Sequence, residues 1–278
     1  MTQVPRRLVV VDEGSGPAVV LVHGQPGSTL TWERVRPLLT DLGLRVLTVD
    51  RPGYGRTGGL AADLAGNAAA VNAVLAERGI DSAVLVGHSH GAAVALATAA
   101  LYPRRVLSLV LVAPAVGPEA LGWPDRALAS RAGGPALTWL GFRGLGVLLS
   151  AGSLRTWLVV RRMGVEPVDS YEVVDRLRRG GMWRTFLAEQ RELVRSGRVL
   201  AAMLPAVSAP TALLAGRCDR LVPPKATRAL ASALPAASVR WTAGGHFLPA
   251  REPESVIQLV QRAFVSVGLP RPESAPRA

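Results

Sequence analysis

The chain has 278 residues, of which 49% are hydrophobic and 19% charged, with one cysteine and a formal net charge of +12. A chain of this length can bury a core large enough to fold without a disulfide or a bound metal. Cys218 is the only cysteine, which excludes an internal disulfide, and we interpret it as a small buried residue. The charge is scattered over arginines without zinc-finger spacing or basic-aromatic interleaving, so we attribute it to a coding bias toward G and C and expect no nucleic-acid partner.

Seven short runs rich in valine and leucine predict the strands of one sheet. Their apolar character is continuous rather than alternating, so we expect a mostly parallel sheet with both faces covered and no half-exposed strand. In chain order, the runs are Leu8 to Val11, Ala18 to Val22, Arg45 to Val49, Ala83 to Val86, Val106 to Val112, Thr211 to Ala215 and Ser238 to Trp241.

Helix-length segments separate these strands, and several of them end at Gly or are followed by Pro, as helix ends often are. The alternation of the two predicts an α/β fold with helices on both faces of the sheet. The predicted helices are Thr31 to Leu42, Leu60 to Arg78, Ala92 to Leu101, Lys225 to Leu234 and Pro253 to Val265.

One long interval breaks this alternation. Residues 116–206 contain no comparable strand run, while apolar residues recur at helical spacing around Trp157 and Trp183, which we interpret as packing residues of this segment. We therefore predict a helical cap at 116–206, inserted into a core formed by residues 1–115 and 207–269. Residues 270–278 are rich in Pro and Arg and are predicted to be disordered.

The pentapeptide Gly87-His88-Ser89-His90-Gly91 follows a predicted strand and precedes a helix of small residues. It is a G-x-S-x-G in the strand-turn-helix context that this pattern requires. A serine at the tip of such a tight turn has strained backbone angles, and glycine on either side removes β-carbons that would collide with the adjoining strand and helix. Ser89 is thus the predicted nucleophile, and His88 is interpreted as a residue packed in the turn.

An acid and a base follow in the order expected for a serine nucleophile of this kind, Ser then Asp then His. Asp219 and His246 each lie just past a predicted strand, at the carboxyl ends where open α/β sheets place their sites. Asp219 could instead cap the helix that begins near Pro224. The rival acid position, after the strand that precedes the insertion, offers no carboxylate until Glu119, so we predict the triad Ser89, Asp219 and His246.

Five ordered motifs resemble those of the α/β-hydrolase fold family, and the resemblance extends from about Leu8 to Val267. His23-Gly24-Gln25-Pro26 is similar to its HGxP turn, and Asp50 to Thr57 is similar to its DxxGxGxS loop. The nucleophile turn and the segments around the acid and the base match its other three motifs. The resemblance implies the serine-nucleophile branch of the family, with a helical cap over the site.

The resemblance also implies roles for residues beside the nucleophile. The backbone N–H groups of Gln25 and His90 would form the oxyanion hole, and His23 would hold the turn that contains Gly24 through side-chain hydrogen bonds. Asp50 and Arg51 are interpreted as polar residues that brace their loop. No metal and no organic cofactor is implied.

Two features depart from the family pattern. Only one strand precedes Ala18, where relatives often have a longer hairpin, so we expect the edge strand there to be short or missing. His90 stands where many members have Met or Trp, which affects the shape of the pocket.

The predicted activity is hydrolysis of a carboxylic ester or lactone, with a small to medium, largely apolar acyl compound as the partner. A serine at the nucleophile position argues against the epoxide hydrolase and haloalkane dehalogenase branches, which use Asp there. Three alternatives remain open: a carbon-carbon bond hydrolase, an aminopeptidase in which Glu166 or Glu172 binds the substrate amine, and a non-catalytic ligand receptor on the same fold.

Residues 1–13 contain no long apolar segment with a small-residue cleavage site, and runs such as Leu145 to Leu149 are far shorter than the roughly 20 residues that span a bilayer. We expect a cytoplasmic protein without stable membrane insertion. Arg155, Arg161 and Arg162, beside Leu158 to Val160, leave peripheral docking on a membrane open. The sequence indicates no oligomeric state.

Overall fold

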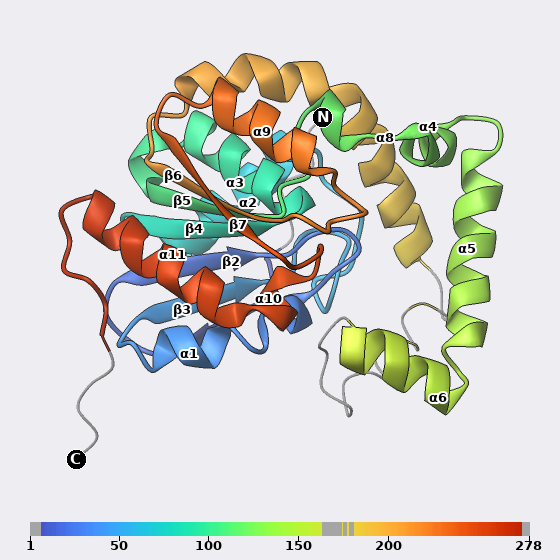
Figure 1. The fold of residues 1–278 in the computed structure, drawn as a ribbon, viewed down its shortest axis with the longest axis horizontal. Coiled ribbons are helices and arrows are strands. Elements are labelled where there is room, and N and C mark those ends of the chain that lie inside the picture. The colour runs from blue at the N-terminus through green and yellow to red at the C-terminus, as the bar shows by residue number, and fades with distance from the viewer. Residues whose placement is uncertain (1–6, 163–173, 175–176, 178–180, 274–278) are drawn as a thin grey trace.

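The computed structural model describes residues 7–162, 174, 177 and 181–273, and a seven-stranded sheet forms its centre (Figure 1). The strand order is β1-β3-β2-β4-β5-β6-β7, and every neighbouring pair is parallel except β1 and β3. The mostly parallel sheet predicted from the apolar runs is confirmed. The strands are β1 (Val10–Glu13), β2 (Ala18–Val22), β3 (Arg45–Val49), β4 (Ala83–His88), β5 (Val106–Val112), β6 (Thr211–Gly216) and β7 (Ala237–Thr242).

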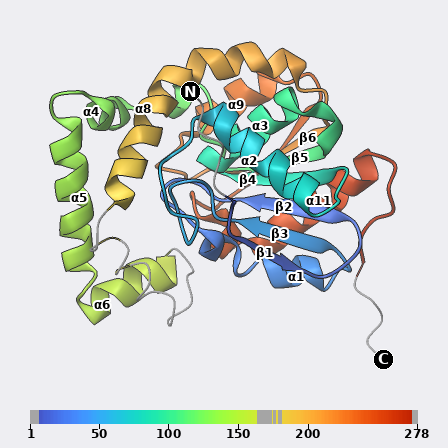
Figure 2. The same cartoon turned by 180° about the vertical axis from the view of Figure 1, so that it is seen from behind.

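Helices cover both faces of the sheet, as Figures 1 and 2 show from opposite sides. On one face lie α2 (Leu64–Glu77), α3 (His90–Leu101) and α9 (Pro224–Ala233), and on the other lie α1 (Arg36–Thr40), α10 (Leu248–Arg251) and α11 (Pro253–Ser266). Each face has its own buried apolar cluster, because alternate side chains of the central strands point to opposite sides. The protein is therefore a three-layer α/β structure.

The expectation that no strand is half-exposed is wrong at the two edges of the sheet. The residues of β1 and β7 are mostly half-buried or exposed, whereas β2 and β4 are buried throughout. An edge strand has a neighbour on one side only, so solvent reaches it whatever its apolar content. β1 is the short edge strand expected before β2, and it begins two residues after the predicted run, at Val10.

Two further expectations need correction. The helix predicted over residues 31–42 is a 3-10 turn at Thr29–Trp32 followed by the short α1, which has Pro37 in its first turn, where a missing N–H costs nothing. Cys218 is exposed rather than buried, because it lies in the loop after β6 and not in the strand.

The residues between β5 and β6 form helices, and those that the structure describes contain no strand. This segment stands to one side of the sheet, with α5 as its outermost helix in both views (Figures 1 and 2). The long α8 returns from it to the core and contacts α3. The elements are α4 (Trp123–Ala129), α5 (Gly134–Leu148), α6 (Gly152–Arg155), a π-helical turn (Thr156–Arg162) and α8 (Met182–Met203).

Short 3-10 turns complete the described chain at Pro103–Arg105, Pro118–Ala120 and Leu204–Ala206. Of the tail expected to be disordered, residues 270–273 are described and contact α11, since Gln261 Nε2 donates to the Pro272 carbonyl at 2.7 Å. Residues 274–278 lie outside the described part of the chain.

No single helix among the described residues is long and apolar enough to cross a bilayer. The helical pair Gly134–Leu148 and Gly152–Arg161 reaches that length and composition only when its two members are taken together, and they are bent by 109°.

The buried sheet yields a stability prediction. Leu85 in β4 is 0% exposed and Leu60 is 78% exposed. Because Leu85→Ala would leave a cavity between packed layers, we expect it to lower the free energy of unfolding by about 2–5 kcal/mol, and we expect Leu60→Ala to change it by less than about 0.5 kcal/mol. Urea unfolding of both variants tests this, and equal losses would contradict the assignment of β4 to the core.

Candidate active site

Ser89 occupies the turn between β4 and α3, with φ of 54° and ψ of −119°. A positive φ is costly for a residue other than glycine, so the surrounding packing must hold this conformation. A β-carbon on Gly91 would lie 2.2 Å from the Val22 carbonyl oxygen, and one on Gly87 would lie 2.4 Å from the Gly91 carbonyl oxygen. Glycine at both positions therefore lets strand and helix close tightly around the serine.

Asp219 and His246 lie in the loops after β6 and β7, and their side chains meet. His246 Nδ1 is 2.8 Å from Asp219 Oδ2, while Asp219 Oδ1 accepts the N–H groups of Leu221 and Val222 at 2.8 Å each. Burial alone would raise the pKa of Asp219, but the hydrogen bond from His246 and those from these N–H groups outweigh burial and lower it. The carboxylate is thus ionised and holds the proton of His246 on Nδ1, which leaves Nε2 as the acceptor.

Asp219 does not cap the helix that follows it, which was its alternative role. The N-cap of α9 is Pro223, without a side-chain cap hydrogen bond. The Asp219 carboxylate instead turns toward the loop of His246.

His88 braces the loop that contains His246. Its Nε2 donates to the His246 carbonyl oxygen at 3.0 Å, and the two imidazole centroids are 4.9 Å apart. Burial, and then the proximity of His246, lowers the pKa of His88 to about 3, so His88 is neutral near neutral pH. This agrees with its interpretation as a residue packed in the turn.

Ser89 and His246 line one cavity. No hydrogen bond joins the Ser89 hydroxyl to the imidazole among the described contacts, and such bonds often tighten only when substrate binds. The structure therefore brings the three predicted triad residues to one place, with the pair of His246 and Asp219 already formed.

The turn after β2 lies directly against the serine. A β-carbon on Gly24 would be 2.9 Å from Ser89 Cβ, so only glycine allows this approach. His23 Nδ1 donates to the Gly24 carbonyl at 2.7 Å and its Nε2 accepts the Arg51 N–H at 3.0 Å, as expected for a residue that holds the turn. Among the backbone hydrogen bonds of turns and loops in the described residues, none is donated by the N–H group of Gln25 or of His90.

A buried ion pair joins this turn to the helical insertion, and the sequence did not indicate it. Arg51, after β3, and Glu189, in α8, have side chains that are each 1% exposed. Arg51 Nη1 donates to Glu189 Oε1, Nη2 donates to Oε2 at 3.2 Å, and the Tyr54 hydroxyl donates to Oε2 at 2.7 Å. The same guanidinium donates to the carbonyls of His23 and Gly24, each at 2.9 Å.

Arg51 keeps the buried carboxylate ionised. Burial alone would raise the pKa of Glu189, but the charge of Arg51 and the hydrogen bonds from Arg51 and Tyr54 outweigh it and lower that pKa. The one sequence signal was the position of Glu189 four residues from Thr185 and from Leu193, both buried on the same face of α8. A carboxylate on a buried face of a helix needs a cationic partner, but the sequence pattern does not indicate which residue supplies it.

The side chain of His90 faces this ion pair and is not among the residues that line the cavity. It is 2% exposed, with Nε2 3.8 Å from Glu189 Oε1. Burial lowers the pKa of His90 to about 4 against the opposing effect of Glu189, so the ring is neutral near neutral pH. Its departure from the family pattern therefore affects the packing behind the site rather than the wall of the pocket.

Asp50 braces the loop after β3, as expected. Its carboxylate accepts the N–H groups of Thr29 and Arg56, each at 2.8 Å, and its carbonyl accepts the Thr57 hydroxyl at 2.7 Å. Arg51 has the larger part described above. Gln25 adds a second link to the insertion, because its Nε2 donates to Gln190 Oε1 at 2.6 Å.

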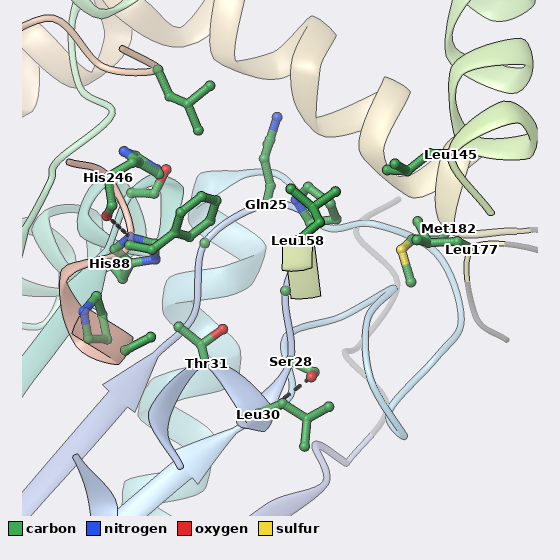
Figure 3. A pocket seen from close by; sticks show the side chains of 18 of the residues that line it. Gln25, Ser28, Leu30, Thr31, His88, Leu145, Leu158, Leu177, Met182 and His246 are labelled. Atoms are coloured by element: carbon green, nitrogen blue, oxygen red, sulfur yellow. Dashed lines mark hydrogen bonds between the residues drawn. The ribbon is translucent and has the colours of Figure 1, made fainter. Parts of the chain in front are cut away.

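The cavity next to Ser89 has a volume of about 240 Å³ and a mostly apolar wall. Among the described residues, no Asp, Glu, Lys or Arg lines it. In Figure 3, Leu145, Leu177 and Met182 of the insertion lie across the cavity from His88 and His246. The remaining apolar side chains of the wall are Pro26, Leu30, Leu149, Leu158, Leu221, Phe247, Pro249 and Ala250.

Several residues considered from the sequence are not at this site. Glu166 and Glu172 lie outside the described residues. Trp157, expected to pack inside the insertion, is 52% exposed, and Trp183 is half-buried.

A family model described as alpha/beta hydrolase fold matches residues 17–253. The chain therefore belongs to the α/β-hydrolase fold family. Epoxide hydrolase B of Mycobacterium tuberculosis is 36% identical over 124 aligned positions, and the alignment covers 42% of this chain and 34% of that protein. The pimeloyl-[acyl-carrier protein] methyl ester esterase of Photobacterium profundum is 40% identical over 101 residues, 36% of this chain and 38% of that protein. The matches thus span about a third of these relatives.

Solved structures share the fold over nearly the whole chain. A thermophilic esterase from Thermogutta terrifontis superposes with a TM-score of 0.68 at 24% identity, over 94% of this chain and 93% of that one. The haloalkane dehalogenase DbeA from Bradyrhizobium elkani does so with a TM-score of 0.69 at 21% identity, over 94% and 95%. At identities this low, structural similarity establishes the fold alone, and the reaction must be inferred from the residues of the site.

The buried histidines predict how stability depends on pH. Burial lowers the pKa of His23, His88 and His90 in the folded chain, whereas in the unfolded chain each takes up a proton near pH 6.5. Below that pH only the unfolded state gains these protons. The free energy of unfolding therefore decreases as the pH is lowered, by up to about 1.4 kcal/mol per pH unit for each histidine. Urea unfolding between about pH 7 and pH 5 measures this.

The matched variant for this test is His90→Gln. Removing one buried histidine should reduce the pH slope by about a third if the three contribute equally. A slope that is flat in the native chain, or unchanged in the variant, would contradict the assignment of neutral buried imidazoles.

Proposed function

We propose that this chain is a serine hydrolase that cleaves a carboxylic ester or lactone of a small to medium apolar substrate through an acyl-enzyme on Ser89. The observation that carries the proposal is a serine held at positive φ, in one apolar cavity with a histidine already paired to an ionised aspartate. Activation of a hydroxyl needs a base near it and a group that orients the base.

In the proposed reaction, His246 Nε2 accepts the Ser89 proton as Oγ attacks the carbonyl carbon. Asp219 holds the imidazole in the required tautomer and stabilises the cation that forms. His246 then returns the proton to the leaving alkoxide, and a water activated by the same imidazole releases the acid. His88, which donates to the His246 carbonyl, would hold the base in place through the cycle.

The N–H groups of Gln25 and His90 are the proposed oxyanion donors. His90 follows Ser89 as the first residue of α3, and Gln25 follows Gly24, the residue of the turn after β2 that approaches Ser89 most closely. Donors of this kind are typically worth about 3–4 kcal/mol each in the transition state. Arg51 and His23 would fix the position of the Gln25 donor, because they hydrogen-bond the preceding residues of the turn.

Reaction chemistry favours an ester over the epoxide named for one relative. Attack of a serine hydroxyl on an epoxide would form an ether, which has no carbonyl for water to attack, so the enzyme could not be regenerated. Attack on an ester forms an acyl-enzyme that water can hydrolyse. The other relative is named as a methyl ester esterase, which agrees with this preference.

The cavity wall favours an apolar, uncharged acyl group. An aminopeptidase would need a carboxylate for the substrate amine, and among the described residues none lines the cavity. A carbon-carbon hydrolase would use the same triad and remains the second candidate. A non-catalytic receptor would have no need of the strained serine.

The first prediction concerns the nucleophile. A fluorophosphonate should form one adduct, on Ser89, and the purified chain should hydrolyse uncharged p-nitrophenyl acyl esters but not epoxides. Ser28 lines the same cavity, so Ser28→Ala is the matched control and should keep both labelling and activity, whereas Ser89→Ala should lose both. Mass spectrometry of the adduct and initial rates measure these outcomes, and a label on any other residue would contradict the triad.

The second prediction separates backbone from side-chain roles in the oxyanion hole. Gln25→Ala and His90→Ala keep the backbone N–H, so kcat should fall by less than about tenfold. Gln25→Pro removes one donor and restricts the residue before it, so kcat should fall by about 100-fold or more. Thermal melts establish that each variant is folded. If a folded alanine variant loses as much activity as Ser89→Ala, the side chains themselves are catalytic.

A further inference from the structure

The outermost helix of the insertion, α5, exposes apolar side chains that a helix of its composition normally buries. Only Gly134, Thr138 and Gly146 of this helix are buried. A helix that is apolar on all sides is expected inside a core or against lipid, because its surface is costly to hydrate. The exposed large hydrophobic residues of this region are Trp123, Leu137, Trp139, Leu140, Leu145, Val147, Leu148 and Trp157.

Positive charge accompanies this apolar surface. Residues 126–162 contain six arginines and no Asp, Glu or Lys, and of these Arg126, Arg131, Arg143 and Arg161 are exposed. The guanidinium of Arg143 lies 5.7 Å from the ring centroid of Trp139, which places an arginine beside an interfacial aromatic residue. Apolar residues, tryptophans and exposed arginines together match a membrane interface that carries anionic headgroups.

The surface is free to reach such an interface. In both views α5 lies at the margin of the molecule, away from the sheet (Figures 1 and 2). It packs on α4 and α8, where the ring centroids of Phe142 and Phe186 are 5.3 Å apart, and Leu145 and Leu149 at its end line the cavity beside Ser89. The 109° bend between α5 and the following helix excludes a straight crossing of the bilayer, so the two would lie in the interface.

We propose that the outer face of α5, with the flanking Trp123, Trp157 and exposed arginines, docks the protein on an anionic lipid surface. The proposal does not depend on the reaction at Ser89, because it uses the outer side of the insertion.

The test is cosedimentation with vesicles of phosphatidylcholine alone and with about 30% phosphatidylglycerol. Binding should be stronger to the anionic vesicles and should weaken with salt. Leu140→Asp with Leu148→Asp should weaken it at least tenfold, and so should Arg143→Glu with Arg161→Glu. None of these residues lines the cavity, so hydrolysis of a water-soluble ester should be unchanged, which shows that each variant is folded.

Controls come from other parts of the surface. Leu101→Asp with Val265→Asp replaces exposed apolar residues of α3 and α11, and Arg104→Glu with Arg262→Glu makes the same change of net charge on the core. Both pairs should bind like the native chain. Equal binding to the two kinds of vesicle, or equal loss in the controls, would overturn the proposal.

A second copy of the chain is the competing occupant of this face. Light scattering after size exclusion distinguishes it, because a native dimer that Leu140→Asp with Leu148→Asp splits would show that α5 is a protein interface. That result would overturn docking on lipid, whereas a native monomer that binds anionic vesicles supports it.

Discussion

The ion pair of Arg51 and Glu189 is the contact on which the arrangement of the site depends. Desolvating two charges costs several kcal/mol each, and the pair is tolerated because Tyr54 and two backbone carbonyls satisfy the remaining hydrogen bonds. One guanidinium thereby ties α8 of the insertion to the turn that carries Gln25. A shift of the insertion would break a buried charge pair. The ion pair therefore fixes the part of the cavity wall that the insertion supplies relative to the turn with the proposed oxyanion donor.

The strained serine depends on close packing in the same way. Ser89 keeps a positive φ because Gly87, Gly91 and Gly24 allow two strands and a helix to approach within the space of a β-carbon. Close packing cannot relax when one residue changes, which is why the strain persists. Around Ser89 the site therefore depends on close contacts at three glycines, where no side chain would fit. Asp219 and His246 reach it from loops at the same edge of the sheet.

Much of this could be predicted from the sequence, for a physical reason. Strand runs and the glycines of the nucleophile turn are local signals, since they follow from the period of the chain and from the volume of a β-carbon. The partner of Glu189 is not local, because 138 residues separate it from Arg51 and no pattern in α8 names a cation. The half-exposed β1 and β7 were missed for a related reason, since being at an edge is a property of the sheet order and not of the strand.

The α5 helix is where local rules and the folded chain disagree most clearly. Its composition predicts burial, yet only Gly134, Thr138 and Gly146 of the helix are buried, and the half-buried Phe142 packs against Phe186 of α8. The exposed leucines of α5 and its single tryptophan, Trp139, belong to neither buried cluster of the sheet, so the packing of the core does not explain them. A segment that violates patterning without a folding benefit points to a function outside the fold. The adjoining arginines, with no acidic residue from 126 to 162, define the charge of the surface that it would meet.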